Sequence, residues 1–392
     1  LSPSNLCFRF SFCGRGRDIT RAVDAWKAAA EGGTPFLLVI GASGAGKASL
    51  ARAGVVPRLT VPGVVPEVDL WRVAVLRPSE ASGGPIVSLA TRLLDGPGDI
   101  PEADAGRPQA LPELAESDFR TPGELAELLR HAGAAAVTPI IRTLDRLGEL
   151  ERTRQGYDRS LRIDLVLLID QLDELFAADV EAAERTAFAA LLGHFATTRR
   201  IWIVATLRAD LYERFLGEPA LLALKTGGAT YDLAPPGSAE LADIVRQPAA
   251  AAALVFETDP ATGERLDARL LRAADRPDML PLLQLALNRL FEGPIIVGGE
   301  ALLTIAAFNA LGGLAGVIDR EAERAVSTLG EAELVALPRL LRRLVVVAHE
   351  GASARGASLT IRTVPLRAAT PDEPSRRLVA ARHPARKAPR PW

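Results

Sequence analysis

The chain has 392 residues, of which 46 are Lys or Arg and 48 are Asp or Glu, and its formal net charge is −2 at pH 7. This near-neutral, interspersed charge excludes a general electrostatic attraction to nucleic acid or to an anionic membrane. No apolar run reaches the ~20 residues that span a bilayer, and both cysteines, Cys7 and Cys13, are expected to be free thiols in a reducing compartment. We therefore expect a cytoplasmic protein. Its length predicts two or three domains.

The N-terminal part predicts a leader, residues 1–31, that ends in a helix. Within Asp18–Ala30, apolar residues share one helical face, and two glycines follow the segment. Helix-length segments then separate apolar runs that predict buried strands, which favours a doubly wound parallel α/β sheet. The predicted strands are Phe36–Ile40, Trp71–Leu76, Leu165–Ile169, Ile201–Ala205 and a short closing run, Thr230–Leu233.

A phosphate-binding loop is predicted directly after the first strand. Its sequence is Gly41-Ala42-Ser43-Gly44-Ala45-Gly46-Lys47. Glycines at this spacing let successive backbone N–H groups face phosphate oxygens, and Lys47 would neutralise the β and γ phosphates. The hydroxyl that usually follows the lysine and binds magnesium is missing, because Ala48 occupies that position. Ser49, one residue later, is a candidate metal ligand in its place.

Acidic and basic residues follow two other predicted strands. Asp170 closes the third strand and is a candidate magnesium ligand, while Glu174, with Asp173 as its rival, is a candidate for positioning the attacking water. The alternative is that these acids only solvate the start of a helix. Arg208 follows the fourth strand, where it would either sense the γ phosphate or pair with Asp210.

The remaining boundaries follow from changes in composition and pattern. A P-loop domain is expected over residues 32–236, with an insertion at 80–160 that contains the helices Glu124–His131 and Pro139–Arg152. Residues 237–317 predict an all-helical domain, and 318–381 a winged-helix-like domain that is incomplete. Residues 382–392 are rich in Pro and Arg, which predicts a disordered tail left by truncation or a frame change. A basic nucleic-acid-binding arm is the alternative.

Several segments together carry a resemblance to one family. They are Phe12-Cys13-Gly14-Arg15, the phosphate loop, Arg52–Pro57, Leu168–Phe176, Thr206–Tyr212, Leu280–Leu287, Leu311–Leu314 and Val364–Leu366. Over about residues 8 to 381 the chain resembles the bacterial novel STAND NTPase domain, whose relatives are AAA+-related P-loop signalling ATPases. The resemblance implies a switch that ADP holds closed and that opens on exchange for ATP, self-associates and activates an effector.

The resemblance also implies roles for individual residues. Gly14 and Arg15 would contact the adenine or ribose side of ATP or ADP, and Pro281 would contact the base, although Met279 replaces the glycine that normally precedes that proline by two places. Mg²⁺ would be the second cofactor. Ala48 departs from the family pattern, so we expect nucleotide binding to survive better than hydrolysis.

Three hypotheses of function follow from these patterns. The first is a nucleotide-dependent signalling switch with slow ATP hydrolysis and self-association in the ATP state. The second is a scaffold that binds ADP or ATP with little turnover, which Ala48 favours. The third is a DNA-binding regulator that uses the winged helix, which the near-neutral charge disfavours. The resemblance implies an effector or sensor domain, such as a WD-repeat propeller. The sequence contains no internal repeats, so we expect such a propeller to be absent from this chain.

Overall fold

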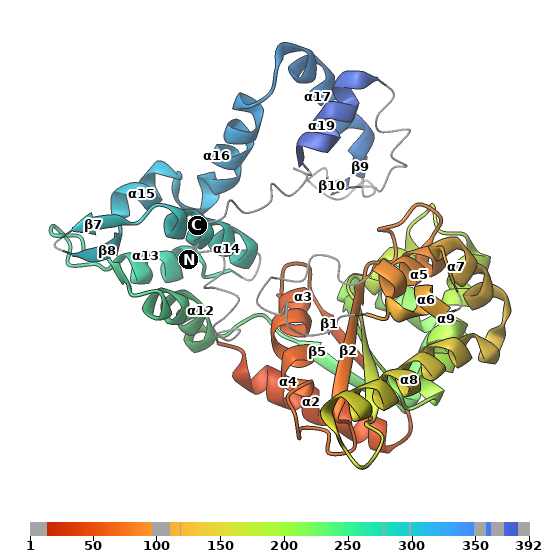
Figure 1. The fold of residues 1–392 in the computed structure, drawn as a ribbon. Coiled ribbons are helices and arrows are strands. Elements are labelled where there is room, and N and C mark those ends of the chain that lie inside the picture. Colours follow the sequence, from red (N-terminus) through yellow and green to blue (C-terminus); the bar gives the residue numbers. More distant parts are fainter. Residues whose placement is uncertain are drawn as a thin grey trace. The chain divides into compact units, whose positions relative to one another are not determined.

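The computed structural model describes residues 14–95, 110–117, 119–276, 279–297, 299–348, 358–361 and 372–382. The chain divides into two compact units, Leu1–Leu314 and Ala315–Trp392. Figure 1 follows the elements of both along the sequence. Both cysteines, the segment Val364–Leu366 and the predicted tail from residue 383 onward lie outside the described residues.

A parallel sheet of five strands forms the centre of the first unit, and its order is β2-β3-β4-β1-β5. The strands are β1 (Phe36–Gly41), β2 (Leu70–Leu76), β3 (Ile163–Ile169), β4 (Ile201–Arg208) and β5 (Ala229–Leu233). All five predicted strands are therefore confirmed. The register aligns Gly41 with Arg208, and Ile169 with Ala205. The carboxyl ends of β1, β4 and β3 consequently lie side by side at one edge of the sheet.

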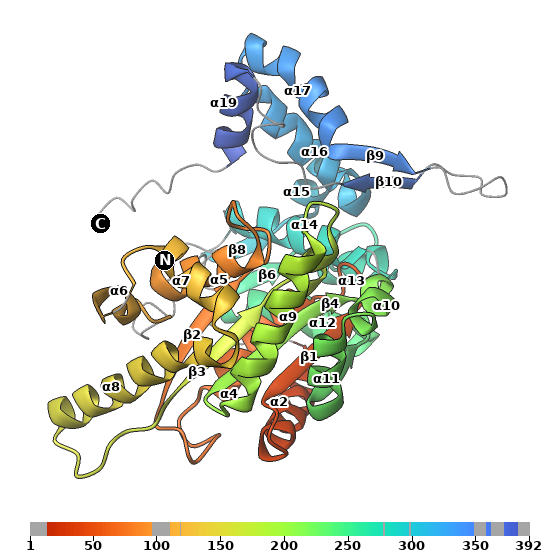
Figure 2. The ribbon, with the colours of Figure 1, turned by 90° about the vertical axis from the view of Figure 1, so that its right-hand side faces the viewer.

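Alternate residues of each central strand enter two separate cores, as expected for a sheet that is covered on both faces. In β1, Phe36, Leu38 and Ile40 join one core and Leu37 and Val39 join the other. The first core is covered by α5 (Pro85–Asp95), α6 (Glu113–Ser117), α7 (Pro122–His131), α8 (Thr138–Gln155), α9 (Ala182–Thr197), α10 (Tyr212–Leu216) and α11 (Pro219–Gly227), with the short 3₁₀ segments η3 (Gly133–Val137), η4 (Leu172–Phe176) and η5 (Ala209–Leu211) between them. Figure 2 shows α9 lying along this face.

The second core lies between the sheet and the helices near the N-terminus. These are α2 (Gly16–Glu31), α3 (Lys47–Ser49), the π-helical segment η1 (Leu50–Val55) and α4 (Val56–Leu59). Trp202 of β4 contacts both Trp26 and Trp71 edge-on, with ring centroids 5.8 and 5.5 Å apart. Because α2 packs in this core, the predicted helix of the leader is confirmed, and it fixes the first described residues against the sheet.

The segment between β2 and β3 packs directly on the sheet. The two predicted helices of this segment are present within α7 and α8. Leu125 and Leu144 from these helices belong to the same buried core as Leu165 of β3. The segment predicted as an insertion thus supplies much of the cover of this face.

The region after β5 contains helices and a small sheet. Its elements are α12 (Ser238–Ala251), β6 (Leu254–Phe256), α13 (Leu266–Ala273), α14 (Leu280–Glu292), β7 (Ile295–Val297), β8 (Glu300–Leu303) and α15 (Ile305–Ala310). The strands pair in the order β6-β8-β7, so the prediction of an all-helical region is wrong. Strands of three or four residues are too short to show a period of two, and β6 and β8 meet only through the tertiary fold.

In the second unit, α16 (Gly313–Ser327) continues from the first unit and is followed by α17 (Glu331–Leu344), β9 (Val345–Ala348), β10 (Ser358–Ile361) and α19 (Glu373–Arg382). The two strands pair antiparallel, and α17 packs on α19 through Leu340 and Leu378. The winged-helix assignment stays a prediction. In the described parts of both units, no helix is both long and apolar enough to cross a membrane.

Candidate functional site

The loop after β1 has the backbone of a phosphate cradle. Gly44 and Gly46 have φ of 77° and 91°, a conformation that side chains disfavour. A Cβ on Gly41 would lie 2.8 Å from the carbonyl oxygen of Leu233, so this position has room only for glycine. A continuous helical run of α3, η1 and α4 begins at Lys47. The predicted loop, from Gly41 through Lys47, therefore has the geometry that phosphate binding needs.

Lys47 is folded back onto this loop. Its Nζ donates hydrogen bonds to the carbonyl oxygens of Gly41 at 2.9 Å and Ala42 at 2.7 Å. Burial lowers the pKa of the Lys47 ammonium, and the nearby carboxylate of Asp173 opposes this shift more than any other charge does. The ammonium is thus held at the mouth of the loop, where an anion could replace the two carbonyls as its partner.

Gly14 and Arg15 lie between the loop and α12. Arg15 is buried, and its guanidinium donates to the carbonyl oxygens of Ala234 at 3.0 Å and Ala45 at 3.4 Å. It also pairs with Asp18 at 2.9 Å. Gly14 has φ of 78°, and a Cβ there would lie 2.4 Å from the carbonyl oxygen of Glu240. The structure therefore brings Arg15 to the loop and Gly14 to α12, and their contact with adenine or ribose stays a prediction.

Pro281, at the start of α14, also reaches the loop. A Cβ on Gly44 would lie 3.0 Å from Cγ of Pro281, and one on Gly46 would lie 4.0 Å from Cδ2 of Leu280. Residues far apart in the sequence thus touch across the phosphate loop. Because Pro281 leaves no free space for a side chain at Gly44, any ligand in the loop lies close to the region after β5.

Asp170, the predicted magnesium ligand, is buried at the end of β3 and already has partners on both carboxylate oxygens. Oδ2 accepts from Nη2 of Arg52 at 2.8 Å and from the guanidinium of Arg77 at 3.4 Å. Oδ1 accepts from the hydroxyl of Thr206 at 3.1 Å. Sequence reasoning missed both arginines as members of the site. The one available signal was that Arg52 belongs to a run that carries the family resemblance.

The chain turns sharply after Asp170. Gln171 has φ of 61°, a left-handed conformation that is uncommon for a residue with a side chain, and its N–H donates to the hydroxyl of Thr206 at 2.8 Å. Strained residues of this kind cluster at functional sites. The turn leads into η4, which contains both Asp173 and Glu174.

Asp173 and Glu174 point to different neighbours. Oδ1 of Asp173 accepts from the backbone N–H of Arg208 at 3.3 Å, on the side of the site that faces Lys47. Oε2 of Glu174 accepts from the N–H and the hydroxyl of Ser79 at 3.0 and 2.6 Å. Burial raises the pKa of both carboxyls. The charge of Asp173 therefore acts on Lys47 of the phosphate loop more strongly than the charge of Glu174 does.

Arg208 forms a two-bond ion pair with Asp210, at 3.1 and 2.6 Å, and both side chains are exposed. Of the two roles predicted for Arg208, pairing is the one that this structure contains. Its register opposite Gly41 places its backbone beside the phosphate loop, so sensing of a γ phosphate stays a prediction that requires the pair to open.

Metal binding fits the site less well than phosphate binding. Within the described ranges, no group of three or more His, Cys, Asp or Glu side chains could hold a metal ion. The side chain of Ala48 has no oxygen atom, and the guanidinium groups of Arg52 and Arg77 already contact Asp170. Ser49 lies on the helical run and is partly exposed. In this arrangement arginines are the partners of Asp170, and the metal-ligand roles of Asp170 and Ser49 stay predictions.

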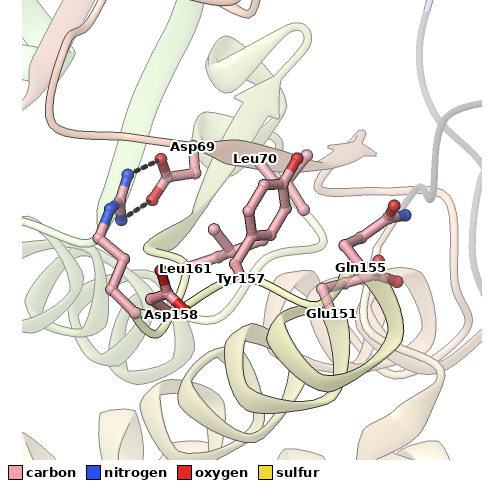
Figure 3. Close-up of a pocket in the computed structure, with 8 residues that line it drawn as sticks. Asp69, Leu70, Glu151, Gln155, Tyr157, Asp158 and Leu161 are labelled. Carbon is pink, nitrogen blue, oxygen red and sulfur yellow. Dashed lines mark hydrogen bonds and ion pairs between the residues drawn. The ribbon is translucent and has the colours of Figure 1, made fainter.

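A cavity of about 570 Å³ lies elsewhere, and Figure 3 shows its lining. The lining residues are Asp69, Leu70, Glu151, Gln155, Tyr157, Asp158, Arg159 and Leu161. Leu70 begins β2 and Leu161 precedes β3, so the cavity lies at the amino ends of the strands. The phosphate loop lies at the carboxyl ends. The cavity is therefore separate from the candidate site.

The family described as Novel STAND NTPase 1 matches residues 9–383. The chain belongs to this family. The predicted fold class is thereby confirmed in its main part: the first unit contains the parallel α/β sheet of a P-loop NTPase, and the chain is a STAND NTPase. No curated protein matches the chain.

A comparison with solved structures finds proteins to which the chain is similar. The ORC2 protein of Aeropyrum pernix, in ADPNP and ADP complexes, is 16% identical, with 83% of this chain and 73% of that chain covered and a TM-score of 0.43. A Walker-type ATPase of Pyrococcus abyssi is 12% identical, with 84% and 75% covered and a TM-score of 0.42. Domain III of Thermotoga maritima DnaA is 15% identical, with 81% and 95% covered and a TM-score of 0.37. With these values below 0.5, the family assignment rests on the family match.

Proposed function

We propose that this STAND NTPase is a nucleotide-dependent signalling switch that binds ATP or ADP, hydrolyses ATP slowly and couples exchange to opening and self-association. The observation that carries the proposal is the close approach of Pro281 of α14 to Gly44 of the phosphate loop, where an added Cβ would lie 3.0 Å from Cγ of Pro281. A ligand that fills the loop has to adjust to this contact. Binding in the loop is thereby linked to the position of the region after β5.

The loop and its neighbours supply the proposed binding groups. Backbone N–H groups of the loop would bind phosphate oxygens, and Lys47 would exchange its two carbonyl partners for the β and γ phosphates. Arg208 would leave Asp210 to contact the γ phosphate. Gly14 and Arg15 would lie against the adenine or ribose. Since Arg15 bonds to Ala45 of the loop and to Ala234 before α12, it forms a second link between the two regions.

Hydrolysis requires a residue that orients water, and the proposal assigns this role to Asp173 or Glu174. Asp173 faces Lys47, whereas Glu174 is bonded to Ser79. Asp173→Asn and Glu174→Gln separate the two. The variant that loses turnover and keeps ATP binding identifies the residue, and that variant should form a larger particle with ATP in light scattering. Unchanged turnover in both variants would show that neither Asp173 nor Glu174 orients the attacking water.

A second candidate function is a scaffold that binds ADP or ATP with little hydrolysis. Two observations favour it. Ala48 lacks the hydroxyl that usually serves as a metal ligand, and Asp170 is paired with Arg52 and Arg77. Binding without turnover would distinguish the scaffold from the switch. The metal-ligand roles of Asp170 and Ser49 stay predictions.

The test of the proposed function is direct nucleotide binding. Purified protein is denatured, any released nucleotide is identified, and ATP and ADP are then titrated into wild type, Lys47→Ala and Lys27→Ala. At a hundredfold excess over the dissociation constant, nucleotide should stabilise wild type and Lys27→Ala by roughly 2.7 kcal/mol and Lys47→Ala not at all. Lys27 lies on α2, away from the loop, and controls for loss of one ammonium. Equal stabilisation of all three proteins would overturn the proposal.

A further inference from the structure

Two guanidinium groups face the single carboxylate of Asp170. The carboxylate is 1% exposed and contacts two guanidinium groups, of which Arg52 is 32% and Arg77 46% exposed. One negative charge thus faces two positive charges. Around Lys47, the positive charges of Lys47 and Arg208 are balanced by the carboxylates of Asp173 and Asp210. What opposes a divalent cation at Asp170 is therefore the pair of guanidinium groups in direct contact with the carboxylate, which the cation would have to displace.

The contacts also occupy the oxygen atoms that a metal ion would need. Two guanidinium groups donate to Oδ2 of Asp170. The hydroxyl of Thr206 donates to Oδ1, and its orientation is fixed because Thr206 accepts the N–H of Gln171. Magnesium binds carboxylate oxygens directly or through its water ligands. Either arrangement requires at least one of these donors to leave.

Arg52 reaches Asp170 from the π-helical segment η1, in which Leu50 and Val55 are buried. Its Nε atom is buried and has no hydrogen-bond partner among the described residues. An unpartnered buried donor is costly. The guanidinium is therefore not fully satisfied by Asp170.

We propose that Arg52, assisted by Arg77, is a positioning residue that competes with divalent cations for Asp170, so that the phosphate loop accepts nucleotide without metal. The nucleotide part of this inference rests on the proposed function, whereas the competition for Asp170 does not. In this chain a P-loop with a strand-end aspartate is thus combined with two arginines that already pair with that aspartate. Arg52 sets the metal concentration at which Asp170 changes partner.

Two measurements test the inference on the full chain. Mn²⁺ binding to nucleotide-free protein is measured by electron paramagnetic resonance, and binding of a fluorescent ADP is measured in EDTA and in Mg²⁺. Wild type should bind ADP equally well under both conditions. Arg52→Gln should bind Mn²⁺ about tenfold more tightly, by analogy with the smallest change that one adjacent positive charge causes in proton binding by a carboxylate. Its ADP binding should also become stronger in Mg²⁺ than in EDTA.

Four further variants separate competition from a structural role. Arg52→Lys keeps the charge and should retain the weak Mn²⁺ binding of wild type. Arg58→Gln, an exposed arginine in the following turn, should behave as wild type. The double variant Arg52→Gln with Asp170→Asn should lose the gained Mn²⁺ affinity. Arg77→Gln, which changes a more exposed side chain, gives the same test with a smaller shift if Arg52→Gln does not fold.

The outcomes are distinguishable from failure of the proposed function. Unchanged or weaker Mn²⁺ binding in Arg52→Gln and Arg77→Gln overturns the inference, even if nucleotide binds. Wild type that binds ADP only with Mg²⁺ overturns it as well. If no protein binds ADP while Arg52→Gln gains Mn²⁺ affinity, the proposed function fails and the competition for Asp170 stands.

Discussion

The carboxyl ends of β1 and β3 lie one strand apart at the same edge of the sheet, and they are built in different ways. After β1, backbone conformation makes the site: Gly44 and Gly46 have positive φ, and Gly41 has no room for a side chain. After β3, side chains make the site, because Asp170 is surrounded by Arg77, which follows β2, and by groups from β4 and η1. The first is determined locally, and the second depends on the fold.

This difference explains why the two ends differ in their fit to a ligand. The donors of the glycine loop are backbone N–H groups, which are uncharged and therefore need no counter-charge when no ligand is bound. A buried carboxylate requires partners to be stable, so its neighbours supply them whether or not a metal is bound. The following experiments test this contrast, from the largest expected effect to the smallest.

The largest effect should come from Asp170→Asn. Removing this carboxylate leaves Arg52 and Arg77 facing each other without a counter-charge, which should lower the free energy of unfolding by about 3 kcal/mol. Asp210→Asn, which breaks an exposed arginine pair at the same edge of the sheet, should cost less than about 1 kcal/mol. Urea unfolding of both variants measures the two values. Equal losses would show that burial of Asp170 contributes nothing to the difference.

Gly44→Ala should have the next largest effect. The substitution adds left-handed strain and pushes a methyl group to 3.0 Å from Cγ of Pro281. Gly63→Ala is the matched control, because Gly63 also has positive φ, at 84°, but has open space around it. Strain alone should cost each variant about 1 to 2 kcal/mol. Only Gly44→Ala should show a further loss and weaker nucleotide binding. Identical stability and nucleotide binding in the two variants would show that Pro281 does not restrict residue 44 or the ligand.

A smaller effect is expected in the pH dependence of stability. Burial raises the pKa of the Glu174 carboxyl, so the folded state binds more protons than the unfolded state between the usual and the raised pKa. The free energy of unfolding should therefore fall as pH rises through the raised pKa, and Glu174→Gln should remove this fall. Urea unfolding between about pH 4 and 7 measures it. Glu213→Gln, at an exposed position on α10, should leave the curve unchanged, and parallel curves for wild type and Glu174→Gln would contradict the prediction.

Ala48→Ser should leave stability almost unchanged, because residue 48 is partly exposed on the helical run. The restored hydroxyl should raise ATP hydrolysis and steepen its dependence on magnesium, since it supplies a metal ligand next to the loop. Measuring ATP turnover across a magnesium titration decides this. Ala53→Ser, which adds a hydroxyl five residues later on the same helical run, is the control. An unchanged rate and metal dependence would show that the missing hydroxyl does not limit turnover.

The sequence by itself determined the parts of this protein that depend on short-range pattern. Runs of apolar residues gave all five strands of the sheet, because burial on both faces needs continuous hydrophobicity. Glycine and lysine spacing located the phosphate loop, because its conformation is set by which residues tolerate positive φ. The end of β3 located Asp170. The family match was likewise visible in residues that are contiguous within each motif.

Only the tertiary structure decided what surrounds these residues. Arg52 and Arg77 are 118 and 93 positions away from Asp170 in the sequence, and no periodic pattern connects residues at such separations. The small sheet after β5 also escaped prediction, because strands as short as β6 are stabilised by their partners rather than by their own sequence. The arginine partners of Asp170 follow from the same cause: a buried charge is stabilised by whichever opposite charges the fold brings within reach, and strand order determines which those are.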